Sequence, residues 1–208
     1  NVDDEDWAEN WKKQYKPFRL GQHMVVKPGW ETFDAQPDDK IIEIDPGMAF
    51  GTGTHETTGM CVELIEDYVK PGDTAIDIGT GTGILAIAAA LAGAKDVLAT
   101  DLDPVAVRVA AENVRINGFA DVIRTRQGDL LQAVDERANV VIANIIADVI
   151  AMLAQPVRAH IEDGGLFICS GIARERSDFV IEALKAAGYQ QPMDIREKGE
   201  WMAIAARK

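Results

Sequence analysis

The sequence predicts an α/β fold in which a mostly parallel, twisted sheet is flanked by helices and closes with a C-terminal antiparallel hairpin. From Thr74 onward, short apolar runs typical of buried strands alternate with amphipathic helical patterns. The first of these runs breaks into a glycine-rich turn before a helix, and the last two runs are joined only through Lys198-Gly199. With 208 residues and 47% hydrophobic content, the chain can bury one good core.

The chain is acidic, with 21 Lys and Arg against 34 Asp and Glu and a net charge of −13. This balance disfavours direct binding to nucleic-acid phosphates and favours a basic partner. Cys61 and Cys169 form neither a Cys-x-x-Cys motif nor a disulfide framework, so we expect a reducing, cytoplasmic location. No apolar run approaches a membrane span, and no signal-peptide pattern is present.

The chain is expected to divide into an N-terminal linker helix with short strands, residues 1–44, and one domain, residues 45–208. Aromatic residues four positions apart predict the helix, at Trp7, Trp11 and Tyr15. This aromatic face either packs on its own domain or docks another domain or partner. Two strands are expected at 22–26 and 40–44. Because the sequence opens on Asn1 without a methionine, we expect a piece of a longer protein.

The glycine-rich turn lies between an expected strand at Thr74–Ile78 and an expected helix at Ile84–Leu91, with glycines at 79, 81 and 83. Glycines permit positive φ and let backbone N–H groups approach a ligand. A dinucleotide-binding turn would need its third glycine at position 84, where Ile84 stands. Asp77, just before the glycines, could hold an ammonium directly or through water. This arrangement resembles motif I of the class I S-adenosylmethionine-dependent methyltransferases, although a tight turn without a ligand is the alternative.

The next strand, residues 97–100, ends at Asp101, about where a nucleoside-binding fold places its ribose acid. Asp103 precedes Pro104 and is therefore assigned to capping the following helix, which leaves Asp101 for the ribose hydroxyls. That helix is expected to end at Asn117-Gly118. Its expected buried residues follow helical spacing: Val107, Ala110, Ala111 and Val114.

Three further segments supply candidate ligand contacts. The glycine- and threonine-rich loop 45–58 feeds a helix with Cys61, Leu64, Ile65 and Tyr68 on its buried face; it could hold a carboxylate, or Thr54 or its neighbours could simply cap the helix. Asp129 follows a strand at 122–126 and either accepts from an adenine amino group or is a solvated loop acid. Asn144 ends a strand at 139–143, with a purely structural role as the alternative.

No metal site is expected. The pair His55-Glu56 lacks the second histidine that a His-Glu-x-x-His motif needs, because Gly59 stands there. The chain contains only one other pair of histidines, His23 and His160.

The remaining elements are expected to be helices at 148–159 and 174–187 and strands at 165–170, 192–196 and 201–206. Helices separate the early strands, which predicts parallel pairing, and the last pair forms the hairpin. The result is a mostly parallel sheet with one antiparallel edge strand.

Taken together, the sequence resembles the PrmA-type ribosomal protein methyltransferases. The resemblance runs from about Trp7 to the C-terminus. It rests on Asp45-Pro-Gly-Met-Ala-Phe-Gly-Thr-Gly-Thr-His-Glu-Thr-Thr58, Asp77-Ile-Gly-Thr-Gly-Thr-Gly-Ile-Leu85, Thr100-Asp-Leu-Asp-Pro104, Val140-Val-Ile-Ala-Asn-Ile-Ile-Ala147 and Gly199-Glu-Trp201. Family members often have Gly-Cys-Gly-Ser-Gly where this chain has Gly79-Thr-Gly-Thr-Gly83, and the family's N-terminal substrate-recognition domain is expected to be absent.

The resemblance implies a Rossmann-like class I methyltransferase that uses S-adenosylmethionine, leaves S-adenosylhomocysteine, and modifies amino groups of the basic large-subunit ribosomal protein L11. It implies cofactor contacts at Thr58, Gly79, Asp101 and Asn144, and also at Phe50, Thr52 and Asp129. Gly81 and Asp77 are added to the expected cofactor contacts because they belong to the glycine-rich turn. We expect no direct nucleic-acid partner and no membrane.

Asn144 is the expected catalytic residue, because its side-chain oxygen could accept a hydrogen bond from the attacking amine and orient the nitrogen lone pair. One alternative is methylation of a nucleic-acid base, where prolines and an aromatic ring often follow the asparagine; here Ile145, Ile146 and Ala147 follow. Others are a different protein-lysine substrate, a nucleotide-binding module without catalysis, or a dehydrogenase.

Overall fold

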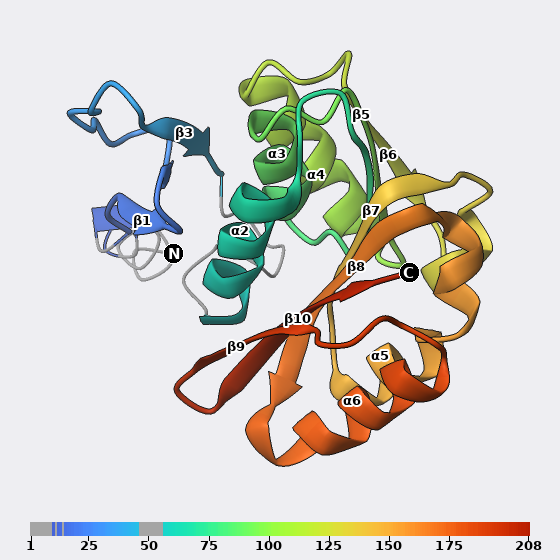
Figure 1. Ribbon diagram of the computed structural model, residues 1–208. Coiled ribbons are helices and arrows are strands. Elements are labelled where there is room, and N and C mark those ends of the chain that lie inside the picture. Colours follow the sequence, from blue (N-terminus) through green and yellow to red (C-terminus); the bar gives the residue numbers. More distant parts are fainter. Residues whose placement is uncertain (1–9, 11, 14, 46–55) are drawn as a thin grey trace, which may run out of the picture.

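The structure, a computed structural model, describes residues 10, 12, 13, 15–45 and 56–208 (Figure 1). The predicted helix at Trp7 to Tyr15 falls largely outside these residues. Among the described residues, no helix is both long and apolar enough to cross a membrane.

The strands form two sheets. A small sheet has the order β1-β2-β3, and a large one has the order β6-β5-β4-β7-β8-β10-β9. The small sheet contains β1 (Phe18–Leu20), β2 (Met24–Lys27) and β3 (Lys40–Glu43). The large sheet contains β4 (Thr74–Ile78), β5 (Asp96–Asp101), β6 (Ile123–Gln127), β7 (Ala138–Asn144), β8 (Ile161–Ala173), β9 (Asp194–Lys198) and β10 (Trp201–Arg207).

Helices connect most of these strands. The α-helices are α2 (Glu56–Tyr68), α3 (Ile84–Leu91), α4 (Pro104–Ile116), α5 (Ala147–Leu153) and α6 (Ser177–Ala186). In the described part of the chain, three short 3₁₀ helices are η1 (Leu130–Ala133), η2 (Pro156–His160) and η3 (Arg174–Arg176).

The large sheet is buried on both faces, because alternate side chains of its strands enter two separate apolar clusters. In β7, Val140 and Ile142 belong to the cluster that α2 and α3 cover. Val141 and Ala143 belong to the opposite cluster, which includes residues of α5 and α6. Figure 1 shows these two layers, with α2, α3 and α4 on one side of the sheet and α5 and α6 on the other.

The predicted mostly parallel sheet with a C-terminal hairpin is confirmed. The hairpin sits differently from the prediction, however. β10 lies between β8 and β9 and runs antiparallel to both. The antiparallel strand, which was predicted at the edge of the large sheet, is therefore inside it. The edge strand is β9, which runs in the same direction as β8. The stretch Met202–Ala206 of β10 is wholly apolar. Its position next to β8 buries both of its faces.

Three predicted elements need correction. The small sheet has an additional strand, β1, which pairs antiparallel with β2. The helix predicted at 148–159 ends at Leu153 and resumes as a 3₁₀ helix at Pro156, whose ring fixes φ and removes an N–H donor. The strand predicted at 165–170 extends over 161–173.

The buried face of α4 differs from the prediction by one position. Ala110 and Val114 are buried as expected, but Ala111 is exposed and Val107 only half-buried. Ala106 and Asn113 take their places in the interior. A polar residue therefore occupies the inner face of this helix, and its contacts lead to the candidate site.

Candidate functional site

The order β5-β4-β7 brings three strand ends together at one edge of the large sheet. These strands run parallel in register, so the glycine turn after β4, Asp101 at the end of β5 and Asn144 at the end of β7 lie side by side. Ligands of open α/β sheets bind at the carboxyl ends of the strands. The predicted site residues from three separate motifs therefore gather at one place.

The glycine turn adopts a backbone that only glycine takes readily. Gly79, Gly81 and Gly83 have φ values of 71°, 56° and 85°. A methyl group on Gly83 would lie 3.3 Å from Cα and Cβ of Ala110 in α4, and one on Gly79 would lie 3.0 Å from Cγ2 of Ile145. The turn is also fastened to the neighbouring strand, because the Thr80 N–H donates to the carbonyl of Thr100 at 2.9 Å.

Asp77 lies beneath this turn with its carboxyl group out of solvent. Burial raises its pKa to about 7, even though the Thr80 hydroxyl donates to Oδ2 at 2.7 Å. The structure thus ties Asp77 to the turn that it precedes. Its contact with a ligand ammonium, direct or through water, remains a prediction.

Asp101 joins the glycine turn to the start of α4. Its Oδ2 accepts the N–H of Gly81 at 2.9 Å, and its Oδ1 accepts the N–H of Asp103 at 3.0 Å. An ionised carboxylate has about four acceptor positions, so further donors such as hydroxyls can still bind. The assignment of Asp103 to capping is confirmed, since its Oδ1 accepts the N–H of Val105 at 2.8 Å ahead of Pro104.

Asn144 is half-buried at the end of β7 and faces the first turn of α2. Its Nδ2 donates to Oγ1 of Thr58 at 3.4 Å, and Thr58 itself is buried. The structure therefore brings together two residues that stand far apart in the sequence. With its nitrogen directed to Thr58, the amide oxygen accepts no hydrogen bond from the residues that the structure describes, so it can accept one from another donor.

The other predicted contacts are less defined. Asp129 is exposed and precedes η1, where Leu130 has a positive φ of 46°. Its carboxylate makes no capping hydrogen bond, and its contact with an adenine remains a prediction. Phe50 and Thr52 lie outside the described residues, as does most of the loop 45–58.

The whole chain matches a known family. The family model for "Ribosomal protein L11 methyltransferase (PrmA)" matches residues 1–208. This chain belongs to the PrmA family.

Relatives and solved structures agree with this assignment. A ribosomal protein L11 methyltransferase from Pelotomaculum thermopropionicum is 52% identical over 206 residues, covering 99% of this chain and 67% of the relative. A crystal structure of a ribosomal protein L11 methylase from Lactobacillus delbrueckii subsp. bulgaricus superposes with a TM-score of 0.87 at 35% identity, covering 93% of this chain and 100% of that one. The chain spans 64–67% of the length of the curated relatives that it matches.

A more distant likeness supports the fold alone. An RNA methyltransferase from Salinibacter ruber, solved with S-adenosyl-L-homocysteine, has a TM-score of 0.57 at 22% identity and covers 71% of this chain and 87% of that one. The PrmA chain therefore has the Rossmann-like methyltransferase fold that its motifs predicted.

Asn113, which was not among the predicted site residues, connects three parts of the chain. Its Nδ2 donates to the carbonyl of Thr82 in the glycine turn at 2.9 Å, and its Oδ1 accepts the N–H of Asp45 at 2.9 Å. The side chain is wholly buried in α4. The sequence did contain a signal for this role, because Asn113 is a polar residue three positions after Ala110, on the face of the helix that was expected to be apolar.

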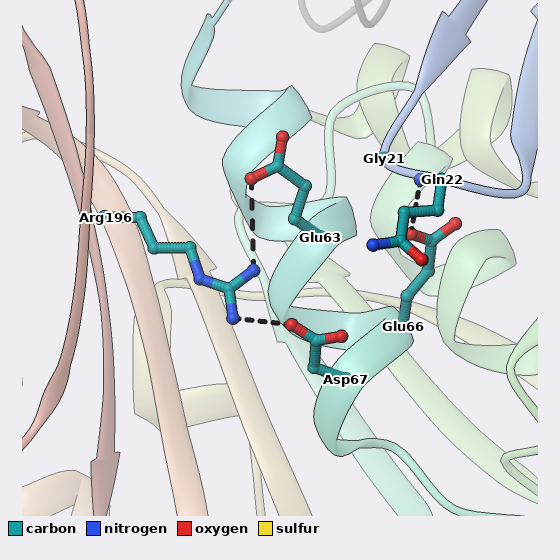
Figure 2. A pocket seen from close by; sticks show the side chains of 6 residues that line it. All are labelled: Gly21, Gln22, Glu63, Glu66, Asp67 and Arg196. Atoms are coloured by element: carbon teal, nitrogen blue, oxygen red, sulfur yellow. Dashed lines mark hydrogen bonds and ion pairs between the residues drawn. The ribbon is translucent and has the colours of Figure 1, made fainter.

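A pocket of about 190 Å³ lies elsewhere, between α2, β9 and the turn after β1 (Figure 2). It is lined by Gly21, Gln22, Glu63, Glu66, Asp67 and Arg196.

The polar groups of this pocket are paired with one another. The Arg196 guanidinium contacts Asp67 at 2.6 Å and Glu63 at 3.9 Å, while Glu66 accepts the backbone N–H groups of Gln22 and His23. At 1.5 Å per residue, Asp67 lies roughly 14 Å along α2 from Thr58. We therefore assign this pocket to the packing of β9 on α2 rather than to the chemistry at the strand ends.

Proposed function

We propose that this chain transfers methyl groups from S-adenosylmethionine to amino groups of ribosomal protein L11, on lysine side chains, the N-terminal amine, or both. The observation that carries the proposal is the meeting of the glycine turn, Asp101 and Asn144 at one sheet edge in a chain of the PrmA family. The relatives named as L11 methyltransferases support the choice of substrate. A ribosomal protein substrate would place the reaction in the cytoplasm.

The residues at the strand ends fit an S-adenosylmethionine ligand by their chemistry. The turn exposes backbone without side chains, Asp101 offers carboxylate oxygens to hydroxyls, and Thr58 and Asn144 close the opposite side. When bound, S-adenosylmethionine supplies a methyl carbon on a sulfonium, whose C–S bond breaks as the amine nitrogen bonds to carbon and the sulfur keeps the electron pair. The role of the protein is then mainly alignment, which can contribute roughly 7–11 kcal/mol.

The attacking amine must be neutral, and a lysine begins with a pKa near 10.4. We assign to Asn144 the task of accepting a hydrogen bond from that amine through its side-chain oxygen. The hydrogen bond from its Nδ2 to Thr58 turns the side-chain oxygen, which lies in the same amide plane, away from Thr58. The amine proton leaves to water, so the reaction needs no His or Cys nucleophile.

The test is methyl transfer followed by mass spectrometry. The protein is incubated with methyl-labelled S-adenosylmethionine and either purified L11 or ribosomal RNA alone. We expect label on L11 amines and none on RNA. Label on RNA alone would replace the proposed substrate with a nucleic-acid base.

The Asn144→Ala variant tests the catalytic role. We expect turnover to fall by about 100-fold, the usual scale for loss of a positioned hydrogen-bonding group. Asn139→Ala is the matched control, because Asn139 lies near the opposite end of the same strand and bonds Thr74. An Asn144→Ala variant with full turnover and unchanged cofactor affinity would remove this role.

A further inference from the structure

β8 carries a bulge beside the end of β7. The parallel pairing of β7 with β8 ends at Asn144 opposite Ser170. On the other side of β8, Ser170 pairs with Ala203 and Ile172 pairs with Met202, so Gly171 has no partner in β10. Its φ is +83°, in the left-handed region. Bulges redirect a strand and its side chains, and they occur often next to active sites.

The space that a side chain at position 171 would need is filled by the main chain of Ile145. A methyl group on Gly171 would lie 2.1 Å from the carbonyl oxygen of Ile145 and 2.8 Å from its carbonyl carbon. Such distances are far below van der Waals contact, so backbone would have to move. Gly171 is therefore required for close approach as well as for its φ.

Two further contacts hold the same segment. The Ile145 N–H donates to the carbonyl of Ser170 at 3.1 Å. Its Cγ2 covers Gly79 of the glycine turn, 3.0 Å from where a methyl group would lie. On the far side of the bulge, the buried Ser170 hydroxyl donates to the carbonyl of Met202 at 2.9 Å. The residue that follows Asn144 is thus enclosed between β8 and the glycine turn.

We propose that Gly171 is a positioning residue for methyl transfer: by lacking a side chain, it lets Ile145 lie against β8 and thereby fixes where the Asn144 amide points. This inference rests on the proposed function of Asn144. A shift of Ile145 moves the adjoining Asn144, whose long hydrogen bond to Thr58, 3.4 Å, has little tolerance for displacement.

The test compares Gly171→Ala with Gly164→Ala. Gly164 lies in the same strand and has a similar φ of +75°, but a methyl group there meets nothing within 4 Å. Both variants carry the cost of a left-handed alanine, and only Gly171→Ala displaces Ile145. We expect kcat for L11 methylation to fall by about 100-fold in Gly171→Ala, the scale for a misplacement near 1 Å, with KM for L11 unchanged. Gly164→Ala should keep the wild-type kcat.

A second readout reports the position of Asn144 directly. Its side-chain amide signals, identified in ¹⁵N-labelled protein by their loss in Asn144→Ala, should shift in Gly171→Ala and stay in place in Gly164→Ala. If Gly171→Ala does not fold, Ser170→Ala replaces it, because removal of the hydroxyl loosens the bulge without adding atoms. That variant should also shift the amide signals and lower kcat.

The outcomes separate this inference from the proposed function. If the wild type methylates no amine, the proposed function fails, and the amide signals alone decide whether Gly171 positions Asn144. Wild-type kcat in Gly171→Ala, unmoved amide signals, or equal losses of kcat in both alanine variants would each overturn the positioning role.

Discussion

At the scale of single residues, Asp77 is unusual because its carboxyl group is buried and its pKa is raised. Its carboxyl group is buried under the glycine turn, and burial raises its pKa to about 7. The neighbouring Asp101 raises this pKa further, while the Thr80 hydroxyl lowers it. A cation bound near the turn would favour the charged form and release a proton.

The raised pKa predicts how stability depends on pH. The folded protein holds the Asp77 proton up to about pH 7, whereas the unfolded chain releases it near its ordinary value of 3.8. Between these values the unfolded state binds fewer protons, so rising pH costs stability, by at most about 4 kcal/mol in total. Asp77→Asn carries no such proton. Urea unfolding from pH 4 to pH 8 should show the variant gaining stability relative to the wild type.

The exposed Asp38→Asn variant is the control, and its stability should follow the wild type throughout this range. If the curves of Asp77→Asn and wild type stay parallel from pH 4 to pH 8, the carboxyl group is not buried as described.

The glycine turn, Asp101 and Asn144 lie at one edge of the sheet, because parallel pairing fixes where strand ends meet. Asp103 and Pro104 form a local cap that needs no tertiary information. By contrast, Gly171 looks like any glycine in the sequence, since its role depends on Ile145, which follows the end of β7. The role of Asn113 likewise arises only when α4 packs on the turn.

At the scale of elements, Asn113 and Asn117 fasten α4 to the chain that leads out of β3. Asn117 bonds the backbone N–H and carbonyl of Glu43, at 2.9 Å and 2.7 Å. Asn113 bonds Asp45 and also reaches the glycine turn at Thr82. One asparagine therefore connects to the candidate site and the other does not.

This difference yields a paired prediction. Asn113→Ala removes two hydrogen bonds of a wholly buried side chain, to the Thr82 carbonyl and the Asp45 N–H, so we expect a loss of about 2–3 kcal/mol in unfolding free energy. We also expect S-adenosylmethionine to bind about tenfold more weakly, because hydrogen bonding of the turn is lost, about 1.4 kcal/mol. Asn117→Ala should lose about 1 kcal/mol and bind as the wild type. Equal cofactor affinity in both variants would contradict the link.

A second element contact joins β9 to α2. Arg196 bonds Asp194 and Asp67, which lowers the pKa of the Asp194 carboxyl, and Tyr68 donates to Asp194 at 2.8 Å. The guanidinium is partly buried, so these ion pairs are screened less than surface pairs. They join the edge strand β9 to α2, in addition to the backbone pairing of β9 with β10.

We expect Arg196→Gln to lower the unfolding free energy by about 1–2 kcal/mol at low salt and by less in 0.5 M NaCl. Arg115→Gln is the control, because Arg115 and Glu112 form an exposed ion pair within one helix, and the unfolding free energy of this variant should stay close to that of the wild type at both salt concentrations. Urea unfolding at both salt concentrations measures the difference. A salt-independent loss would mean that Arg196 acts by packing instead.

Apolar runs bounded by turn residues were predicted almost to the residue, as for Thr74–Ile78 and Ile84–Leu91. The position of the hairpin in the sheet was not predicted correctly, because the pairing of β10 with β8 depends on burial in the assembled sheet. The edge strand β1 was missed since it is only Phe18–Leu20, too short to show alternation.

At the scale of the whole molecule, a net charge of −13 suits a basic protein substrate. Long-range attraction speeds encounter and is screened by salt. We therefore expect kcat/KM for L11 to fall about tenfold between 0.05 and 0.5 M NaCl. The affinity for S-adenosylmethionine should change little. An insensitive kcat/KM would mean that charge does not guide the substrate.

The proposed chemistry depends on the glycine turn and Asp101 holding S-adenosylmethionine. Calorimetric titration of S-adenosylmethionine into the folded protein tests it most directly, with Asp101→Ala and, as the neighbouring control, Asp103→Ala. We expect one binding site, affinity weakened at least about tenfold in Asp101→Ala, and wild-type affinity in Asp103→Ala. No heat of binding with the folded wild type, or equal affinity in wild type and Asp101→Ala, would contradict it.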